Sequence, residues 1–127
     1  YLFSNSLAPS IVSGSIKAID LIENDKKLIT KLKNNTSYFR EKIKGIGYNI
    51  KSGDHPIVPI MLGDAKIAKE LAKEMLKKGI YVIGFSFPVV PKDEARIRVQ
   101  ISAGHTLNQI DQAICAFKEC GKALKII

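Results

Sequence analysis

Two arginines, Arg96 and Arg98, lie in the segment R-I-R-V-Q-I near the C-terminus. Polar and apolar residues alternate strictly there, which is typical of a half-buried β-strand, so both guanidinium groups should lie on one face of a sheet. Arginine binds a carboxylate or phosphate through a planar pair of N–H donors. The segment therefore predicts an anion-binding strand. The alternative is that both arginines are ordinary surface residues of an edge strand.

The predicted strand lies between a stiff loop and the start of a helix. Pro88 and Pro91 stiffen the loop, because each ring fixes φ and removes a backbone donor. After the strand, Thr106 and Gln109 have the spacing of a capping box, in which two side chains bind the free amide groups at a helix N-terminus. These neighbours should hold the arginine-bearing strand in place.

The chain has two histidines, His55 and His105, which are further candidates for a catalytic or metal-binding role. Neither belongs to a Cys, Asp or Glu cluster at ligand spacing, so the sequence predicts no metal site. Asp54 and His55 are adjacent on a turn and no nucleophile elbow follows, so a catalytic dyad is not expected. His105 precedes the predicted helix cap, and two roles stay open: it shapes the helix entry, or it contacts a substrate.

The remaining polar and thiol groups give weaker signals. The S-N-S run at residues 4–6 precedes a helix, where it can either bind a phosphate or simply cap the helix. Cys115 and Cys120 are five positions apart in a predicted helix, a spacing that suits neither a disulfide nor a metal. They are interpreted as buried or idle thiols of a reducing compartment.

The composition is that of an ordinary globular protein. A chain of 127 residues, 46% apolar and 25% charged, can form one domain with its own core. No apolar run approaches the roughly 20 residues of a membrane helix, and no signal peptide is visible. The net charge of +8 comes mainly from lysines mixed with acidic residues on predicted helix faces. Since no arginine-rich block interrupts them, we expect neither nucleic acid nor a membrane as partner.

Hydrophobic periodicity and turn residues predict the elements. Helices are expected at residues 7–23, 25–45, 65–78 and 106–124, and strands at 48–51, 57–62, 80–85 and 96–101. Pro59 should place its strand at an edge or a bulge, whereas the strand at 80–85 should be buried on both faces. Leu76 is expected on the buried face of the third helix. This order predicts an α+β fold, a small sheet of three to four mostly antiparallel strands with helices on one side.

Three segments resemble one family. They are Y-L-F-S-N-S-L-A-P at the start, H-P-I-V-P-I-M-L-G-D in the middle, and P-V-V-P-K-D-E-A-R-I-R-V-Q-I-S-A-G-H-T near the end. Over its whole length the chain resembles the C-terminal domain of the α-oxoamine synthases, which are pyridoxal-phosphate enzymes of the fold-type I aminotransferase superfamily. The S-N-S-L-A-P segment is most similar to the corresponding segment of the members that join glycine to acetyl-CoA.

The resemblance implies an acyltransferase that uses pyridoxal 5'-phosphate to condense glycine with acetyl-CoA, giving 2-amino-3-ketobutyrate and CoA, as a step of threonine catabolism. It also implies a homodimer, located in the cytoplasm or, in a eukaryote, in the mitochondrial matrix. Two alternatives stay open. One is another α-oxoamine synthase, making 5-aminolevulinate or 8-amino-7-oxononanoate, and the other is a stand-alone basic binding module.

The resemblance also implies roles for single residues. Arg98 should bind the carboxylate of the amino-acid substrate. Ser4 and Asn5 should reach the cofactor phosphate of the neighbouring subunit, and His105 should lie near the active-site mouth together with the loop from Pro88 to Pro91. It assigns no role to Arg96.

The resemblance further implies that this chain carries no catalytic residue. The family's Schiff-base lysine, the Asp that pairs with the pyridine nitrogen and the His that stacks on the ring all precede the matching region. The chain begins at Tyr1, inside a patterned segment, so we expect a piece of a longer enzyme that is inactive alone. Residues 1–24 are expected to form a linking segment and a helix that bridge to the missing large domain.

Overall fold

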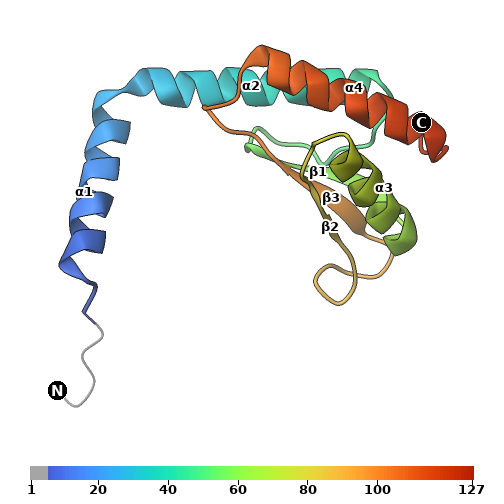
Figure 1. The fold of residues 1–127 in the computed structure, drawn as a ribbon, viewed down its shortest axis with the longest axis horizontal. Helices are drawn as coiled ribbons and strands as arrows, with labels where there is room; N and C mark the ends of the chain where they lie inside the picture. The colour runs from blue at the N-terminus through green and yellow to red at the C-terminus, as the bar shows by residue number, and fades with distance from the viewer. Residues whose placement is uncertain (1–5) are drawn as a thin grey trace.

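The computed structural model describes residues 6–127, and within them the chain forms four helices and one three-stranded antiparallel sheet (Figure 1). The helices are α1 (Pro9–Asn24), α2 (Lys26–Gly45), α3 (Ala65–Lys77) and α4 (Leu107–Ala123), and the strands are β1 (Ile57–Gly63), β2 (Ile83–Phe85) and β3 (Ala95–Gln100). The strand order is β1-β3-β2, so β3 is central. The predicted α+β fold with an antiparallel sheet is confirmed.

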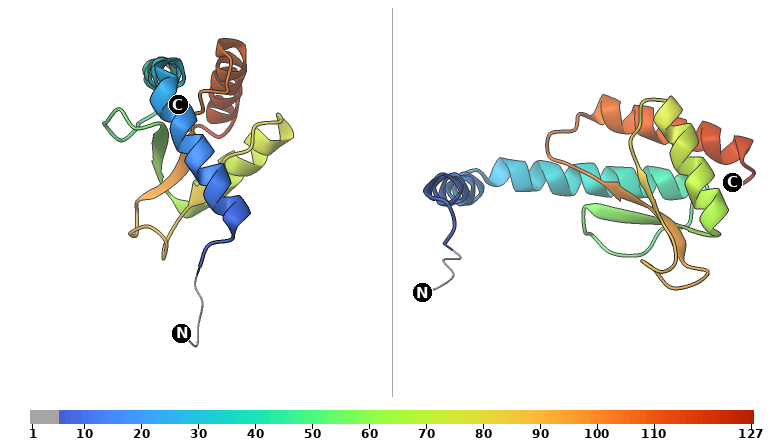
Figure 2. Two further views of the ribbon diagram at one scale, coloured as in Figure 1. Left: turned by 90° about the vertical axis from the view of Figure 1, so that its left-hand side faces the viewer. Right: turned by 60° about the horizontal axis from the view of Figure 1, so that its bottom comes forward.

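One face of the sheet packs against helices. Along β3 the buried residues alternate with more exposed ones, as predicted, and Ile97 and Val99 point into the core. Helices α2 and α4 lie side by side above this face, and α3 packs against all three strands (Figures 1 and 2). Phe39 of α2 and Phe117 of α4 are fully buried there and meet edge to face. Burying this apolar surface is the main force that holds the helices on the sheet.

Helix α1 lies apart from this core. It projects away from the sheet and the other helices, and none of its residues is buried (Figures 1 and 2). Three of its isoleucines, Ile11, Ile16 and Ile19, are more than half exposed. Helices in water usually owe most of their stability to packing of an apolar face, and α1 has no such packing in this chain.

Pro59 lies in an edge strand, as predicted, and β1 is also irregular between Met61 and Gly63. The carbonyl of Pro59 accepts a hydrogen bond from the Lys51 N–H at 3.1 Å, on the side away from β3. In an antiparallel strand the N–H and C=O of one residue point the same way, so the missing N–H costs no bond to β3.

Three expectations about single elements are wrong. The strand at 80–85 has only the three residues of β2, and it is an edge strand with Ile83 47% exposed, because one face of the sheet is uncovered. Residues 48–51 form a single bridge, Ile50 to Ile60, instead of a strand. The carbonyl of Lys51, directly after the bridge, accepts a hydrogen bond from Arg40 at 2.9 Å instead of continuing a strand ladder. Leu76 is exposed, because it lies on the far side of α3 from Leu71.

Candidate functional site

The face of the sheet that no helix covers carries the predicted anion-binding arginines. We call it the open face and define it by the outward-pointing residues of the three strands: Ile57, Pro59, Met61, Ile83, Phe85, Arg96, Arg98 and Gln100. Arg98 lies between Pro59 of β1 and Ile83 of β2. Since β3 is paired on both sides, its backbone is held more firmly than that of an edge strand. The alternative of two arginines on an edge strand is therefore wrong in its strand position.

The two arginines differ in what they bind. The Arg96 Nη2 atom forms an ion pair with Glu94 Oε2 at 3.0 Å, and Arg96 Nε donates to the Glu94 carbonyl at 3.2 Å. The Arg98 Cζ atom lies 4.1 Å from the centroid of the Phe85 ring. Among residues 6–127, none accepts a hydrogen bond from the Arg98 side chain, which is exposed. Arg98 is thus the guanidinium whose donors are available to a ligand.

His105 takes part in a tight turn between β3 and α4. Its N–H donates to the Ser102 carbonyl at 3.2 Å, and its Nδ1 atom accepts from the Ser102 N–H at 3.1 Å. Because Nδ1 is the acceptor, neutral His105 carries its proton on Nε2. His105 also lines a groove of about 390 Å³ whose lining does not include Arg98. The geometry supports the helix-entry role of His105, and the substrate contact stays a prediction.

Asn35 fixes the same turn from α2. Its Nδ2 atom donates to the carbonyls of Ser102 and His105, at 3.1 and 3.0 Å. Directly after the turn, the Thr106 Oγ1 atom accepts from the Gln109 N–H and the Gln109 Oε1 atom accepts from the Thr106 N–H, which confirms the predicted capping box. The turn after β3 is therefore held by hydrogen bonds from α2, and the capping box fixes the start of α4 directly after it. Asn35 continues the helical spacing of Leu28 and Leu32, and an amide at a position in that apolar series is the sequence signal that could have found it.

Arg40 is a second residue that sequence reasoning missed. It is only 9% exposed, and its guanidinium donates to the carbonyls of Lys51, His55 and Ile57. His55 Nδ1 accepts from the Ile57 N–H at 3.0 Å. Both side chains thus order the loop that leads into β1.

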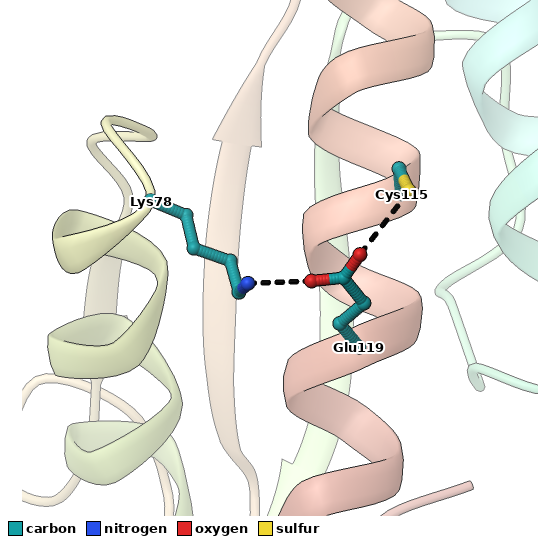
Figure 3. Close-up of polar contacts among 3 residues, drawn as sticks. All are labelled: Lys78, Cys115 and Glu119. Carbon is teal, nitrogen blue, oxygen red and sulfur yellow. Dashed lines mark hydrogen bonds and ion pairs between the residues drawn. The ribbon is translucent and has the colours of Figure 1, made fainter.

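An ion pair ties the end of α3 to α4 (Figure 3). Lys78 Nζ binds Glu119, whose other carboxylate oxygen lies 3.6 Å from the Cys115 sulfur. The hydrogen bond from Lys78 lowers the pKa of Glu119, and the same bond raises the pKa of Lys78. Burial raises the pKa of the other thiol, Cys120. Lys78 and Glu119 thus join α3 to α4, and they lie outside the open face.

Other features bear on the predicted site. Ser4 and Asn5 lie outside the described residues, so their predicted phosphate contact stays a prediction. Within residues 6–127, no group of three or more His, Cys, Asp or Glu side chains is arranged to hold a metal ion. The described helices also include none with the length and hydropathy that a membrane span requires.

Comparison with known proteins assigns the family. The model of aminotransferase class I and II matches residues 1–117. The chain belongs to this family. A curated relative in this aminotransferase family, 2-amino-3-ketobutyrate coenzyme A ligase of Escherichia coli K12, is 50% identical over all 127 residues of this chain, which cover 32% of the relative. The mitochondrial protein of the same name from Mus musculus is 51% identical over 122 residues, which are 96% of this chain and 29% of the relative.

More distant relatives support the same family assignment. The 8-amino-7-oxononanoate synthase of Thermoanaerobacter pseudethanolicus is 37% identical over the whole chain and 32% of its own length. Serine palmitoyltransferase from S. paucimobilis with PLP and myriocin bound superposes with a TM-score of 0.93 at 28% identity, over 98% of this chain and 32% of that one. The chain spans about a third of the length of the curated relatives it matches. The expected resemblance to the α-oxoamine synthases is confirmed.

The described residues fit only part of an active site that holds pyridoxal phosphate. The open face offers the free guanidinium of Arg98, which suits a carboxylate. None of the residues that define this face is a lysine, so the face has no amine that would bind the cofactor covalently. The open face therefore offers a donor group that suits a carboxylate, and its defining residues include no group that would hold the cofactor covalently.

Proposed function

We propose that this chain is the C-terminal, carboxylate-binding part of a pyridoxal-phosphate-dependent glycine C-acetyltransferase, which converts glycine and acetyl-CoA to 2-amino-3-ketobutyrate and CoA. The observation that carries the proposal is the free guanidinium of Arg98 on the central strand. Sequence identity favours this reaction. The Escherichia coli relative named 2-amino-3-ketobutyrate coenzyme A ligase is 50% identical to this chain, whereas the 8-amino-7-oxononanoate synthase is 37% identical. The cofactor, when bound, supplies the electron sink for chemistry at the amino-acid α-carbon.

The role of Arg98 in this proposal is to bind and orient glycine. A carboxylate can accept two parallel N–H bonds from one guanidinium, which fixes both its position and its plane. The residues directly opposite Arg98, Pro59 and Ile83, have no charge that would compete for it. Because β3 is hydrogen-bonded on both sides, the site is ordered before the substrate arrives.

The test is to replace Arg98 in the full-length holoenzyme. Arg98→Ala should weaken glycine binding by about 2 to 5 kcal/mol, because a charge-assisted, paired contact is lost. Arg98→Lys should restore only part of it, since an ammonium group cannot form the bidentate pair. Calorimetric titration with glycine measures both variants without relying on turnover.

Arg96→Ala is the matched control, because it removes a guanidinium from the same face whose donors Glu94 already occupies. It should leave the glycine Kd close to that of the wild type. An unchanged Kd in Arg98→Ala, or an equal loss in both variants, would contradict the assignment. If salt-dependent nucleic-acid binding accompanied an unchanged glycine affinity, the stand-alone basic module would replace it.

We further propose that residues 1–24 connect this domain to the rest of a longer, homodimeric protein, with Ser4 and Asn5 at the cofactor phosphate of the neighbouring subunit. The exposed apolar side chains of α1 support this, since such a surface is normally covered. Backbone amides of α1 should exchange rapidly with deuterium in the 127-residue chain and slowly in the longer protein. Rapid exchange in both would contradict the proposal.

The proposed compartment follows from the relatives. The names of the Mus musculus and Homo sapiens relatives include the word mitochondrial, and those of the bacterial ones do not. We therefore propose the cytoplasm, or the mitochondrial matrix if the source is a eukaryote. We also propose that neither nucleic acid nor a membrane is a partner, because the lysines are mixed with acidic residues and no arginine-rich block interrupts them. Fractionation of the source cells, with an antibody against this chain, tests the placement.

A further inference from the structure

The only described partner of the Arg98 side chain within the open face is an aromatic ring. The Arg98 Cζ atom lies 4.1 Å from the centroid of Phe85, well inside the distance at which a cation is attracted to a ring face. In the sheet register Phe85 pairs with Arg96, and Ile83 pairs with Arg98, so the contact is diagonal across β2 and β3. Such diagonal neighbours are within reach of long and aromatic side chains.

We propose that Phe85 is a positioning residue for the substrate carboxylate, because its ring sets the direction of the Arg98 guanidinium. The inference rests on the proposed function of Arg98. All five N–H donors of a guanidinium lie in its plane, so a ring against its face uses none of them. A free arginine side chain has many rotamers, and restricting them before binding reduces the entropy lost when the carboxylate arrives.

Arg96 shows the other way of restricting a guanidinium. Glu94 fixes it with a carboxylate and a backbone carbonyl, and both contacts consume donors that a ligand would need. The carboxylate of Glu94 also neutralises the charge that would attract an anion. The Phe85 ring restricts Arg98 without either effect. The open face thus holds one arginine that is internally satisfied and one that is oriented but unsatisfied, and only the second is suited to bind substrate.

The test uses the full-length holoenzyme and two ligands. Phe85→Leu keeps an apolar side chain but removes the ring, and it should raise the glycine Kd about three- to ten-fold, the range expected when binding must immobilise one more rotamer-rich side chain. Phe85→Tyr keeps the ring and should stay within about two-fold of the wild type. Glycinamide has no carboxylate, so its Kd should not change in Phe85→Leu. A merely structural role of Phe85 would weaken both ligands alike.

Two further variants separate the possible outcomes. Tyr81→Leu makes the same aromatic-to-leucine change at an exposed position just before β2 and should leave the glycine Kd unchanged. Phe85→Leu should add no loss in an Arg98→Ala background, because the ring then has no guanidinium to orient. If Arg98→Ala is severe but Phe85→Leu binds glycine like the wild type, the role of Phe85 is overturned and the proposed function stands. If Arg98→Ala itself has no effect, the proposed function fails, and this inference fails with it.

Discussion

Asn35 should be essential to the turn that connects the arginine strand to α4. Its side chain is 3% exposed, and its amide donates to the Ser102 and His105 carbonyls, which lie 67 and 70 residues further along the chain. Asn35→Ala removes both donors at once and leaves two carbonyl groups facing a space that was filled by the amide.

The expected cost can be estimated from these contacts. A hydrogen bond between uncharged groups contributes about 1 kcal/mol net, and a buried acceptor left without a partner costs about 1 to 3 kcal/mol. The Ser102 carbonyl keeps the His105 N–H at 3.2 Å, so it loses only part of its partners. Asn35→Ala should therefore reduce the free energy of unfolding by about 2 to 3 kcal/mol.

Asn35→Asp provides a sharper version of the same test. It preserves the shape of the side chain but replaces the donor with a carboxylate oxygen, which would face two carbonyl oxygens. At neutral pH this variant should be less stable than Asn35→Ala, because a buried charge is added to the lost bonds. The difference should shrink at acid pH, where the introduced carboxyl group is protonated and can donate.

Urea unfolding followed by far-ultraviolet circular dichroism measures these changes, since the chain has no tryptophan for fluorescence. With m of about 1 to 3 kcal/mol per M, Asn35→Ala should lower the midpoint by roughly 0.7 to 3 M. The exposed Asn34 on the same helix supplies the control, and Asn34→Ala should stay within about 0.5 kcal/mol of the wild type. The reasoning is refuted if the two alanine variants are equally stable, or if Asn35→Asp is no worse than Asn35→Ala at neutral pH.

Two other contacts make quantitative predictions. A Cβ at Gly121 would clash with the Tyr48 hydroxyl oxygen, so Gly121→Ala should destabilise the chain by about 1 to 3 kcal/mol in urea unfolding. The loss caused by Gly121→Ala should be smaller in a Tyr48→Phe background, and an equal loss in both backgrounds would show that the hydroxyl is not the obstacle. The ion pair with Lys78 lowers the pKa of Glu119, so its stabilisation is present above the ordinary carboxyl pKa and is lost as the pH falls through the lowered pKa. The stability lost in Glu119→Gln should accordingly be largest near neutral pH and disappear in acid, and a pH-independent difference would contradict this.

The elements that sequence predicted well are those whose signals are local. The Thr106 capping box and the alternation along β3 each depend on residues within a few positions of one another. A Pro in an apolar run likewise indicated an edge strand by itself, because its missing N–H excludes a central position.

The errors and omissions depend on contacts that a single sequence does not display. The burial of β2 is set by which sheet face the helices cover, and an apolar run is compatible with either answer. Asn35 and Arg40 act on backbone carbonyls of other segments, and a carbonyl has no sequence signature. The difference between Arg96 and Arg98 belongs here too, because it depends on where Glu94 and the Phe85 ring lie in space.

The unpaired guanidinium of Arg98 should couple substrate binding to the covering of the open face. If the rest of a longer protein covers the open face, Arg98 leaves water, and a buried charge without a partner is costly. The open face offers no acidic side chain to meet it, because the nearby Glu94 already pairs with Arg96. The carboxylate of a bound substrate would supply the missing partner, so closure over this face and substrate binding should stabilise each other. This coupling requires that Arg98 has no anionic partner of its own. The ring of Phe85 orients the guanidinium without providing such a partner.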